Sequence, residues 1–204
     1  MSESLIQAVE NASSSEELVK AVWALSGSQS EEAIPTLIKV LGFNNPGAAV
    51  AAVEGLVQLG DVAVPTLINQ LDGYDYGARA WAIRALSRIA NPEALDILLD
   101  AATNDFSLSV RRAAAKGLGE LRWEKLSPEA REEAQRKVLE TLMTVAKDEE
   151  WIVRYAAIVG LEALAKTVFA GEIQEYLQQR EQAESDLTAR SRIRLAASAN
   201  RVSN

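Results

Sequence analysis

The chain has 204 residues, of which 48% are hydrophobic and 25% charged, and it contains no Cys and no His. These values predict one soluble globular domain spanning 1–204. Without Cys the chain has no disulfide and no thiol nucleophile, and without His it lacks the commonest metal ligand and general base. We therefore expect no metal site.

Acidic residues dominate the first part of the chain. The net charge is 21 − 29 = −8, and residues 1–78 carry Lys20 and Lys39 against ten acidic residues, whereas residues 79–204 are balanced. Nucleic-acid binding depends on clustered Lys and Arg, so we expect no nucleic-acid partner. The N-terminus shows no basic and apolar leader, and no uninterrupted apolar stretch approaches the ~20 residues of a membrane span. We expect the protein to stay where it is made.

Internal repetition is the dominant pattern along the chain. Proline stands in the first turn of a predicted helix at Pro35, Pro65 and Pro128, where its missing N–H has no intrahelical partner. A small residue followed by Leu recurs at spacings of 31, 30, 32 and 43 residues, in the pairs Ala24-Leu25, Gly55-Leu56, Ala85-Leu86, Gly117-Leu118 and Gly160-Leu161. Each repeat is therefore predicted to contain two helices.

The second helix of each pair has one apolar face. Apolar or small residues recur at i, i+4, i+7, i+8 and i+11 from Val110, and the same offsets return from Val153. This is the period of an α-helix with one buried side. The longest spacing predicts a solvated helical insertion at about 122–137, and residues 193–197 echo residues 153–157 as a degenerate sixth unit. The predicted fold is all-α, a right-handed α-solenoid of about five to six helix pairs.

Arginines recur at one position of successive second helices. The four are Arg79, Arg111, Arg154 and Arg194, and the first three follow Asp75, Asp105 and Asp148 by four to six residues. A guanidinium binds a carboxylate with two parallel hydrogen bonds. We therefore expect each Arg to tie down the carboxylate of the loop that precedes it.

Aromatic residues and further arginines gather near the starts of the second helices, although aromatics make up only 5% of the chain. They are Tyr74, Tyr76, Trp81 and Arg84, then Phe106, Arg112 and Trp123, then Trp151 and Tyr155. Aromatic faces and arginines suit a planar anionic ligand, or a partner that presents one, and simple packing between repeats is the alternative. Ile158 and Val159 lie off the apolar face, so we expect a partner protein to cover them together with Trp151.

Three segments, 76–86, 105–119 and 151–162, carry a resemblance to a known family. The most specific strings are Asp105-Phe106-Ser107-Leu108-Ser109-Val110-Arg111-Arg112 and Val153-Arg154-Tyr155-Ala156-Ala157-Ile158-Val159-Gly160-Leu161-Glu162. They resemble the smaller, beta subunits of the heterodimeric phycocyanobilin lyases that act on the phycocyanin alpha chain. These are proteins of HEAT-like repeats, and the resemblance covers roughly residues 20–165.

The resemblance implies a lyase subunit that is active only with its larger HEAT-like partner. It would position phycocyanobilin, a transferred substrate and not a covalently bound cofactor, for thioether attachment to a cysteine of the phycocyanin alpha chain. A cyanobacterial cytoplasm or a plastid stroma, near thylakoid-bound phycobilisomes, is the implied location. A His-Cys motif found in a bilin-isomerising subfamily is absent, which argues against isomerisation.

The residues expected to form the site follow from this resemblance together with the clusters above. Bilin-binding candidates are Tyr74, Tyr76, Trp81, Arg84, Arg112 and Tyr155. Asp75 and Asp105 are the catalytic candidates, as carboxylates that accept from pyrrole N–H groups, and Asp148 is a further such carboxylate. The alternative function is a non-catalytic HEAT-like adaptor or scaffold, such as a bilin-handling or phycobilisome-disassembly factor.

Overall fold

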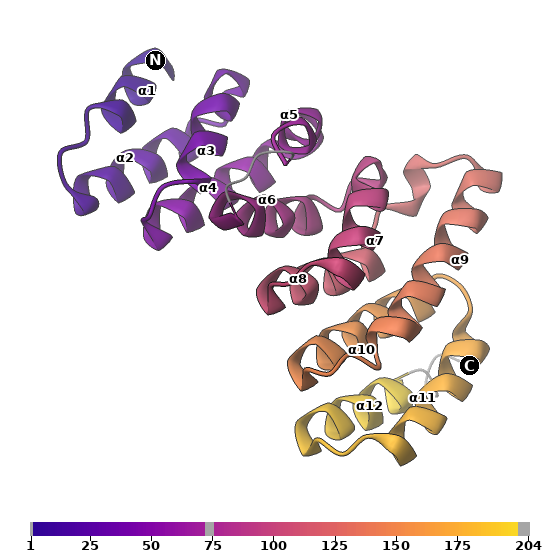
Figure 1. Cartoon of the computed structure of the whole chain (residues 1–204). Coiled ribbons are helices and arrows are strands. Elements are labelled where there is room, and N and C mark those ends of the chain that lie inside the picture. The colour runs from indigo at the N-terminus through magenta and orange to yellow at the C-terminus, as the bar shows by residue number, and fades with distance from the viewer. Residues whose placement is uncertain (1, 72–75, 200–204) are drawn as a thin grey trace. The chain divides into compact units, whose positions relative to one another are not determined.

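The computed structural model describes residues 2–71 and 76–199 of the chain, and helices are the only regular elements in those two ranges. Six helices come first in their pairs: α1 (Ser2–Glu10), α3 (Ile34–Leu41), α5 (Val64–Asn69), α7 (Leu95–Asn104), α9 (Pro128–Val145) and α11 (Ala170–Ala183). Their partners are α2 (Ser15–Gly27), α4 (Pro46–Leu59), α6 (Tyr76–Ile89), α8 (Leu108–Gly119), α10 (Trp151–Ala165) and α12 (Leu187–Ala199) (Figure 1). The predicted all-α solenoid of helix pairs is confirmed.

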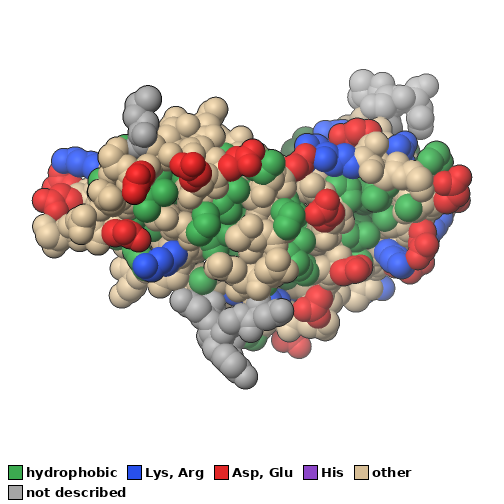
Figure 2. All heavy atoms as spheres, turned by 90° about the horizontal axis from the view of Figure 1, so that it is seen from above, with side chains coloured by type: hydrophobic (Ala, Val, Ile, Leu, Met, Phe, Trp, Pro, Cys, Tyr) green, Lys and Arg blue, Asp and Glu red, His purple; other side chains and the backbone are tan. Residues whose placement is uncertain are grey.

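The chain divides into two compact units, Met1–Ile89 and Ala90–Asn204, and the described residues of each form three helix pairs. In the first unit α4 packs between α2 and α6, and in the second unit α10 packs between α8 and α12. Figure 2 shows acidic side chains along the visible face of the first unit, as its composition requires. One domain over 1–204 remains a prediction beside this division into two units.

Capping and proline chemistry set the helix starts. Ser14 Oγ accepts a hydrogen bond from Glu17 N at 3.2 Å, and the Glu17 carboxylate accepts from Ser13, which lowers the pKa of Glu17. Ser127 Oγ caps α9 by accepting from Ala130 N at 3.3 Å. Prolines occupy the first turns of α3, α4, α5 and α9. The local sequence alone therefore specifies where these helices begin.

Small residues let the second helices approach closely. A Cβ added to Gly55 of α4 would lie 2.5 Å from Ser26 Oγ, and one added to Gly160 of α10 would lie 2.5 Å from the carbonyl oxygen of Ala115 in α8. Ser26 Oγ also donates to the carbonyl oxygen of Ala51 at 2.8 Å, so α2 and α4 are joined by a buried hydrogen bond. Glycine is required at Gly160 because backbone, which cannot move aside, occupies the space of a side chain.

The segment predicted as an insertion, 122–137, forms the short 3₁₀ helix η4 (Trp123–Lys125) and the first turns of α9. Trp123 is buried, and Arg131 Nε donates to its carbonyl oxygen at 2.9 Å. The acidic residues Glu129, Glu132 and Glu133 are exposed. This part of α9 therefore presents a solvated face.

One stretch, Pro46–Asn69, is long and apolar enough by composition to cross a membrane, and 50% of the tested window is buried inside the fold. Its backbone is interrupted where α4 ends, because Gly60 adopts a φ of 69° that favours glycine, and the 3₁₀ helix η2 (Gly60–Ala63) follows. The core helices of repeat proteins have this composition for the same reason that membrane helices do, since both are surrounded by apolar groups.

Candidate functional site

Arg111 of α8 joins two successive loops of the second unit. Its Nη1 donates to the carbonyl oxygen of Asp105 at 2.8 Å, in the loop before its own helix. Its Nε and Nη2 donate to the carboxylate of Asp148 at 2.9 and 3.3 Å, in the loop of the next repeat. The side chain therefore ties its own loop through a backbone oxygen and the following loop through a carboxylate.

Arg154 of α10 repeats this arrangement one unit further along. Its Nη1 donates to the carbonyl oxygens of Asp148 and Glu149, each at 2.9 Å, and its Nε and Nη2 donate to the carboxylate of Glu184 at 2.8 and 2.6 Å. The Glu184 side chain is only 1% exposed. The hydrogen bond from Arg154 lowers the pKa of Glu184, and the same bond raises the pKa of Arg154.

Two details of the predicted arginine ladder are wrong. The carboxylates of Asp148 and Glu184 bind the Arg of the preceding repeat, because stacking brings each loop beside the previous second helix. The third ladder position in this unit belongs to Arg190, whose Nε donates to the carbonyl oxygen of Glu184 at 2.8 Å. Arg194 instead forms an exposed ion pair with Glu181 at 2.6 Å. A shift of four residues is about one helical turn and nearly preserves the apolar pattern, which explains the misalignment.

The ladder decides the role of one candidate carboxylate. Both oxygens of Asp148 face Arg111, and Oδ1 also accepts from Glu150 N at 2.9 Å, in a side chain only 15% exposed. Three hydrogen bonds within the fold thus use most of the acceptor capacity of this carboxylate. Asp105 Oδ1 accepts from Ser107 N at 2.9 Å, in the corresponding loop before α8. Asp75 lies outside the described residues.

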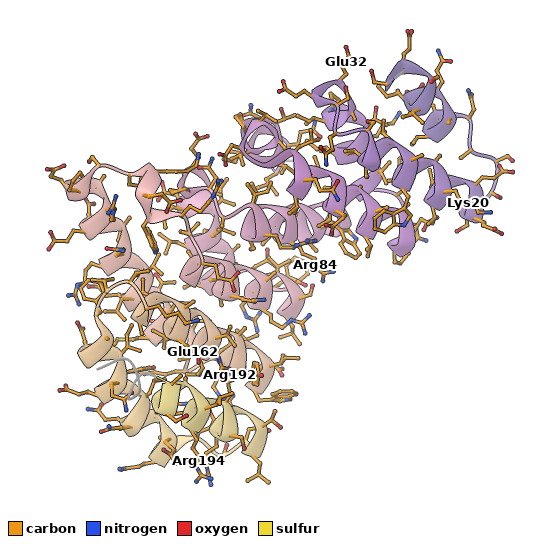
Figure 3. The ribbon with its side chains drawn as sticks, turned by 180° about the vertical axis from the view of Figure 1, so that it is seen from behind. Lys20, Glu32, Arg84, Glu162, Arg192 and Arg194 are labelled. Atoms are coloured by element: carbon orange, nitrogen blue, oxygen red, sulfur yellow. The ribbon has the colours of Figure 1, made fainter. Side chains whose placement is uncertain are left out.

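A hollow of about 290 Å³ lies beside Trp81 in the first unit. The loop between α3 and α4 faces the start of α6 across this hollow. The rest of the lining consists of Leu41, Gly42, Phe43, Asn44, Asn45, Pro46 and Gly77. The Arg84 guanidinium lies over the Trp81 ring, 4.4 Å from its centroid, and Figure 3 labels Arg84 on this helix. Tyr74 lies outside the described residues, as does the side chain of Tyr76.

A groove of about 320 Å³ lies across the starts of three second helices in the other unit. Its lining consists of Arg112 of α8, of Trp151, Ile152 and Tyr155 of α10, and of Thr188 of α12. Trp151 is 40% exposed, and Tyr155 is half-buried. The structure thus brings together three predicted site residues that lie up to 43 positions apart in the sequence.

An ion pair lies behind one wall of this groove. Arg192 of α12 is 8% exposed, pairs with Glu162 of α10, and has its guanidinium carbon 5.9 Å from the centroid of the Tyr155 ring (Figure 3). Thr188 and Arg192 are one turn apart on α12, so they lie on the same face of the helix. The sequence does not reveal this pair when α12 is aligned on Arg194, because the ladder position of α12 belongs to Arg190.

The predicted partner-facing patch needs one correction. Ile158 is 1% exposed, because α10 is flanked by α8 and α12 and packs on α9 and α11. This chain itself covers Ile158, so the expectation that a partner does so is wrong. Val159 is half-buried, whereas Trp151 keeps an exposed face. Other exposed apolar residues of this unit, which the sequence analysis did not single out for an interface, are Phe106, Leu108, Leu187 and Leu195.

Within 2–71 and 76–199, no group of three acidic residues gathers in a way that would hold a metal ion. The candidate site residues that the structure describes are mainly arginines and aromatic residues near the starts of second helices, beside the two hollows. The fold that carries them defines a helical repeat protein of stacked helix pairs.

Comparison with known proteins identifies the family. A model of HEAT repeats matches residues 2–72 and 64–133. The phycocyanobilin lyase subunit beta of Nostoc sp. is 50% identical over 97% of this chain and 100% of its own length, and the phycocyanin alpha phycocyanobilin lyase CpcF of Synechocystis sp. is 54% identical over 86% and 83%. The chain belongs to the phycocyanobilin lyase beta subunit family of HEAT-repeat proteins, as the sequence resemblance predicted.

A solved structure agrees with this assignment. The chain matches the complex of CpcE and CpcF of phycocyanin lyase from Nostoc sp. PCC7120 with a TM-score of 0.79 and 52% identity, over 82% of this chain and 99% of that one. A designed armadillo repeat protein matches with a TM-score of 0.52 at 17% identity, which shows a shared fold alone. The match to a lyase component therefore reflects close relationship as well as general solenoid geometry.

Proposed function

We propose that this chain is the smaller subunit of a phycocyanobilin lyase and that, with a larger HEAT-repeat subunit, it positions phycocyanobilin for attachment to a cysteine of the phycocyanin alpha chain. One observation carries the proposal: the Nostoc lyase subunit beta is 50% identical across 97% of this chain and the whole of its own length. The CpcE and CpcF complex supports the two-subunit assembly.

The composition limits what this subunit contributes to the reaction. With no Cys and no His, the chain supplies neither a thiol nucleophile nor an imidazole base. The nucleophile is then the thiol of the acceptor protein, and the bilin is a transferred substrate with no covalent anchor through a cysteine of this chain. The subunit's own contribution is to orient the pigment relative to that thiol, and such positioning alone lowers a barrier by several kcal/mol.

The residues proposed to contact the bilin remain those of the sequence analysis, namely Tyr74, Tyr76, Trp81, Arg84, Arg112 and Tyr155. The hollow beside Trp81 and the groove between Arg112 and Tyr155 support four members of this set, because each offers an aromatic face next to a guanidinium. These four are Trp81, Arg84, Arg112 and Tyr155. Asp75 and Asp105 are the proposed carboxylates for the pyrrole N–H groups. Trp151 and Val159 remain candidates for the subunit interface.

The proposal includes a cellular setting. Relatives such as the Nostoc and Synechocystis proteins come from cyanobacteria, and one at 53% identity from Synechococcus elongatus is named a phycobilisome maturation protein. We place the chain in the cyanobacterial cytoplasm or the plastid stroma, near the phycobilisomes. Its net charge of −8 argues against a nucleic-acid partner.

Co-expression tests the proposal. Cells produce this chain together with its larger partner subunit, the phycocyanin alpha chain and a source of phycocyanobilin. The acceptor is then denatured and inspected for bound pigment. We expect a blue acceptor whose colour survives denaturation, and no such product when this chain or the acceptor cysteine is omitted. Equal labelling without this chain contradicts the proposal and leaves the non-catalytic adaptor as the better description.

A further inference from the structure

Arg112 differs from the other arginines around it. Of the arginines that the structure describes in the second unit, it alone has neither an ion pair nor a hydrogen bond, whereas its neighbour Arg111 is fully engaged in the ladder. Arg112 is exposed at the rim of the groove that Trp151 and Tyr155 line. A charged group therefore stands unpaired beside an apolar, aromatic hollow.

We propose that this groove binds a propionate-bearing end of the open-chain tetrapyrrole, with Arg112 as the partner of the carboxylate and Trp151 and Tyr155 as the walls for the adjoining pyrrole ring. This inference rests on the proposed function. A guanidinium forms two parallel hydrogen bonds with a carboxylate, and aromatic side chains stack on planar rings. The groove combines the two requirements at one place.

The size of the groove fits part of the pigment. Pockets for drug-sized ligands span roughly 300–1,000 Å³, and this groove of about 320 Å³ lies at the lower end of that range. An open-chain tetrapyrrole has four rings and two propionates, so the groove holds one end of it and leaves the remainder outside. An end that is held while the reacting end stays accessible is the arrangement that transfer to another protein requires. Under this inference Trp151 is a wall of the ligand groove, and Val159 alone is left as the candidate for the subunit interface.

Arg192 and Glu162 act as positioning residues behind the groove. The Arg192 guanidinium lies against the Tyr155 ring and is fixed by its ion pair with Glu162, which joins α12 to α10. Thr188, one turn before Arg192, lines the groove. The pair therefore fixes the orientation of the ring before the ligand arrives, which reduces the ordering cost of binding.

The charge of the groove favours a small carboxylate over a protein as the occupant. A stable protein interface buries about 800 Å² on each partner and presents a polar rim. Here the distinctive feature is a single unpaired guanidinium beside two aromatic rings, which matches one carboxylate on one planar ring. An acidic protein partner remains an outcome of the test.

The test uses the full chain assembled with its larger subunit, and two probes, phycocyanobilin and its dimethyl ester. The ester lacks the negative charges but keeps the rings. Affinity is measured from the change in pigment absorbance on titration. For the free acid, Arg112→Ala should weaken binding about tenfold to hundredfold, the loss expected for one charge-assisted hydrogen-bond pair. In the parent, the dimethyl ester should bind more weakly than the free acid. This loss of affinity on esterification should be at least about tenfold smaller in Arg112→Ala.

Lys116→Ala is the matched control. Lys116 lies one turn further along α8, is exposed, and carries the same charge, yet it does not line the groove. It should change the affinity for either probe less than about twofold. An equal loss of affinity in Lys116→Ala and Arg112→Ala would mean that the overall positive charge of α8 attracts the pigment. This result would overturn the assignment of Arg112.

A second variant tests the positioning pair. Glu162→Gln removes the ion pair of Arg192 but leaves Arg112 in place, so it should weaken the acid and the ester by the same factor and alter the induced circular dichroism of the bound pigment. A purely structural role would lower the thermal midpoint without changing that spectral signature at temperatures where the protein is folded, and this result would overturn the positioning role.

The outcomes separate this inference from the proposed function. If the parent labels its acceptor and Arg112→Ala binds the acid and the ester as the parent does, the groove assignment is wrong and the proposed function stands. If Arg112→Ala or Trp151→Ala weakens association with the larger subunit, while the fraction that stays assembled binds the acid as the parent does, the groove is a protein interface and the inference is overturned. If the parent fails to label any acceptor, the proposed function fails, and the comparison of acid with ester still decides whether the groove binds a carboxylate.

Discussion

The guanidinium of Arg111 on α8 lies 2.9 Å from the carboxylate of Asp148, which is 37 positions further along the chain in the loop before α10. The same guanidinium also holds the carbonyl oxygen of Asp105. One side chain thus fixes the distance between successive repeats of the second unit. The neighbouring Arg112 makes no such contact, so two adjacent arginines have separate roles, one in the fold and one at its surface.

Replacing these two arginines in turn should separate stability from binding. Arg111→Ala leaves the partly buried Asp148 carboxylate without its cation, and we expect the free energy of unfolding to fall by about 2–4 kcal/mol. Arg112→Ala should change it by less than about 0.5 kcal/mol, as is usual at exposed positions. Urea unfolding followed by circular dichroism measures both. Equal stability losses would contradict the division of roles.

Acid should weaken the ladder through Glu184. The hydrogen bond from Arg154 lowers the pKa of Glu184 from its ordinary value of 4.5 in the folded protein. A carboxylate whose folded pKa is depressed contributes stability that is present above the unfolded pKa and is lost as the pH falls through the folded pKa. We therefore expect the free energy of unfolding to decline below about pH 4.5.

Glu184→Gln provides the comparison for this pH effect. Because the amide does not titrate, the variant should lose less stability between pH 7 and pH 3 than the parent, although it starts from a lower value. Equilibrium unfolding at several pH values gives both slopes. Parallel curves for parent and variant would show that other carboxylates cause the acid sensitivity.

The close approach of α8 and α10 should make Gly160 intolerant of a side chain. In Gly160→Ala the new Cβ would lie 2.5 Å from the Ala115 carbonyl oxygen, so the helices must separate, at a cost of about 1–3 kcal/mol. Gly171→Ala is the control, because nothing lies within 4 Å of a Cβ there, in the first turn of α11. Its thermal midpoint should stay the same or rise, since Ala favours helix more than Gly does. Similar losses at both sites would rule out close packing as the cause.

The helix pairs could be predicted from the sequence because a 3.6-residue period, capping residues and first-turn prolines are all local signals. Which repeat each ladder carboxylate serves depends on how the repeats stack, and spacing along the chain does not reveal it. Asp148 was therefore assigned to the wrong arginine. Arg194 was taken for Arg190 because a four-residue shift preserves the apolar face of a helix.

Parts of the site could be predicted, and the reasons for the failures are physical. Arg112 and Tyr155 were identified because aromatic residues make up only 5% of the chain, yet they gather with arginines near the starts of the second helices. Thr188 and the ion pair between Arg192 and Glu162 were not predicted, because α12 was aligned on Arg194 and its residues were therefore placed one turn out of register. Ile158 was misassigned because an internal helix of a stack has neighbours on both sides, which widens its buried arc beyond that of a half-buried helix.

Comparing Arg84→Ala with Arg112→Ala should decide which hollow holds the pigment. Arg84 already lies over the Trp81 ring, whereas Arg112 has no partner among the described residues, so Arg84 gives up an existing contact if it binds a carboxylate. We expect Arg112→Ala to slow pigment transfer about tenfold to hundredfold and Arg84→Ala to slow it less than tenfold, with thermal midpoints near that of the parent in both. Transfer rates with the larger subunit present and thermal midpoints of the two purified variants are measured side by side. If Arg84→Ala shows the larger loss while remaining folded, the hollow beside Trp81 is the principal bilin site and the groove at Arg112 is secondary.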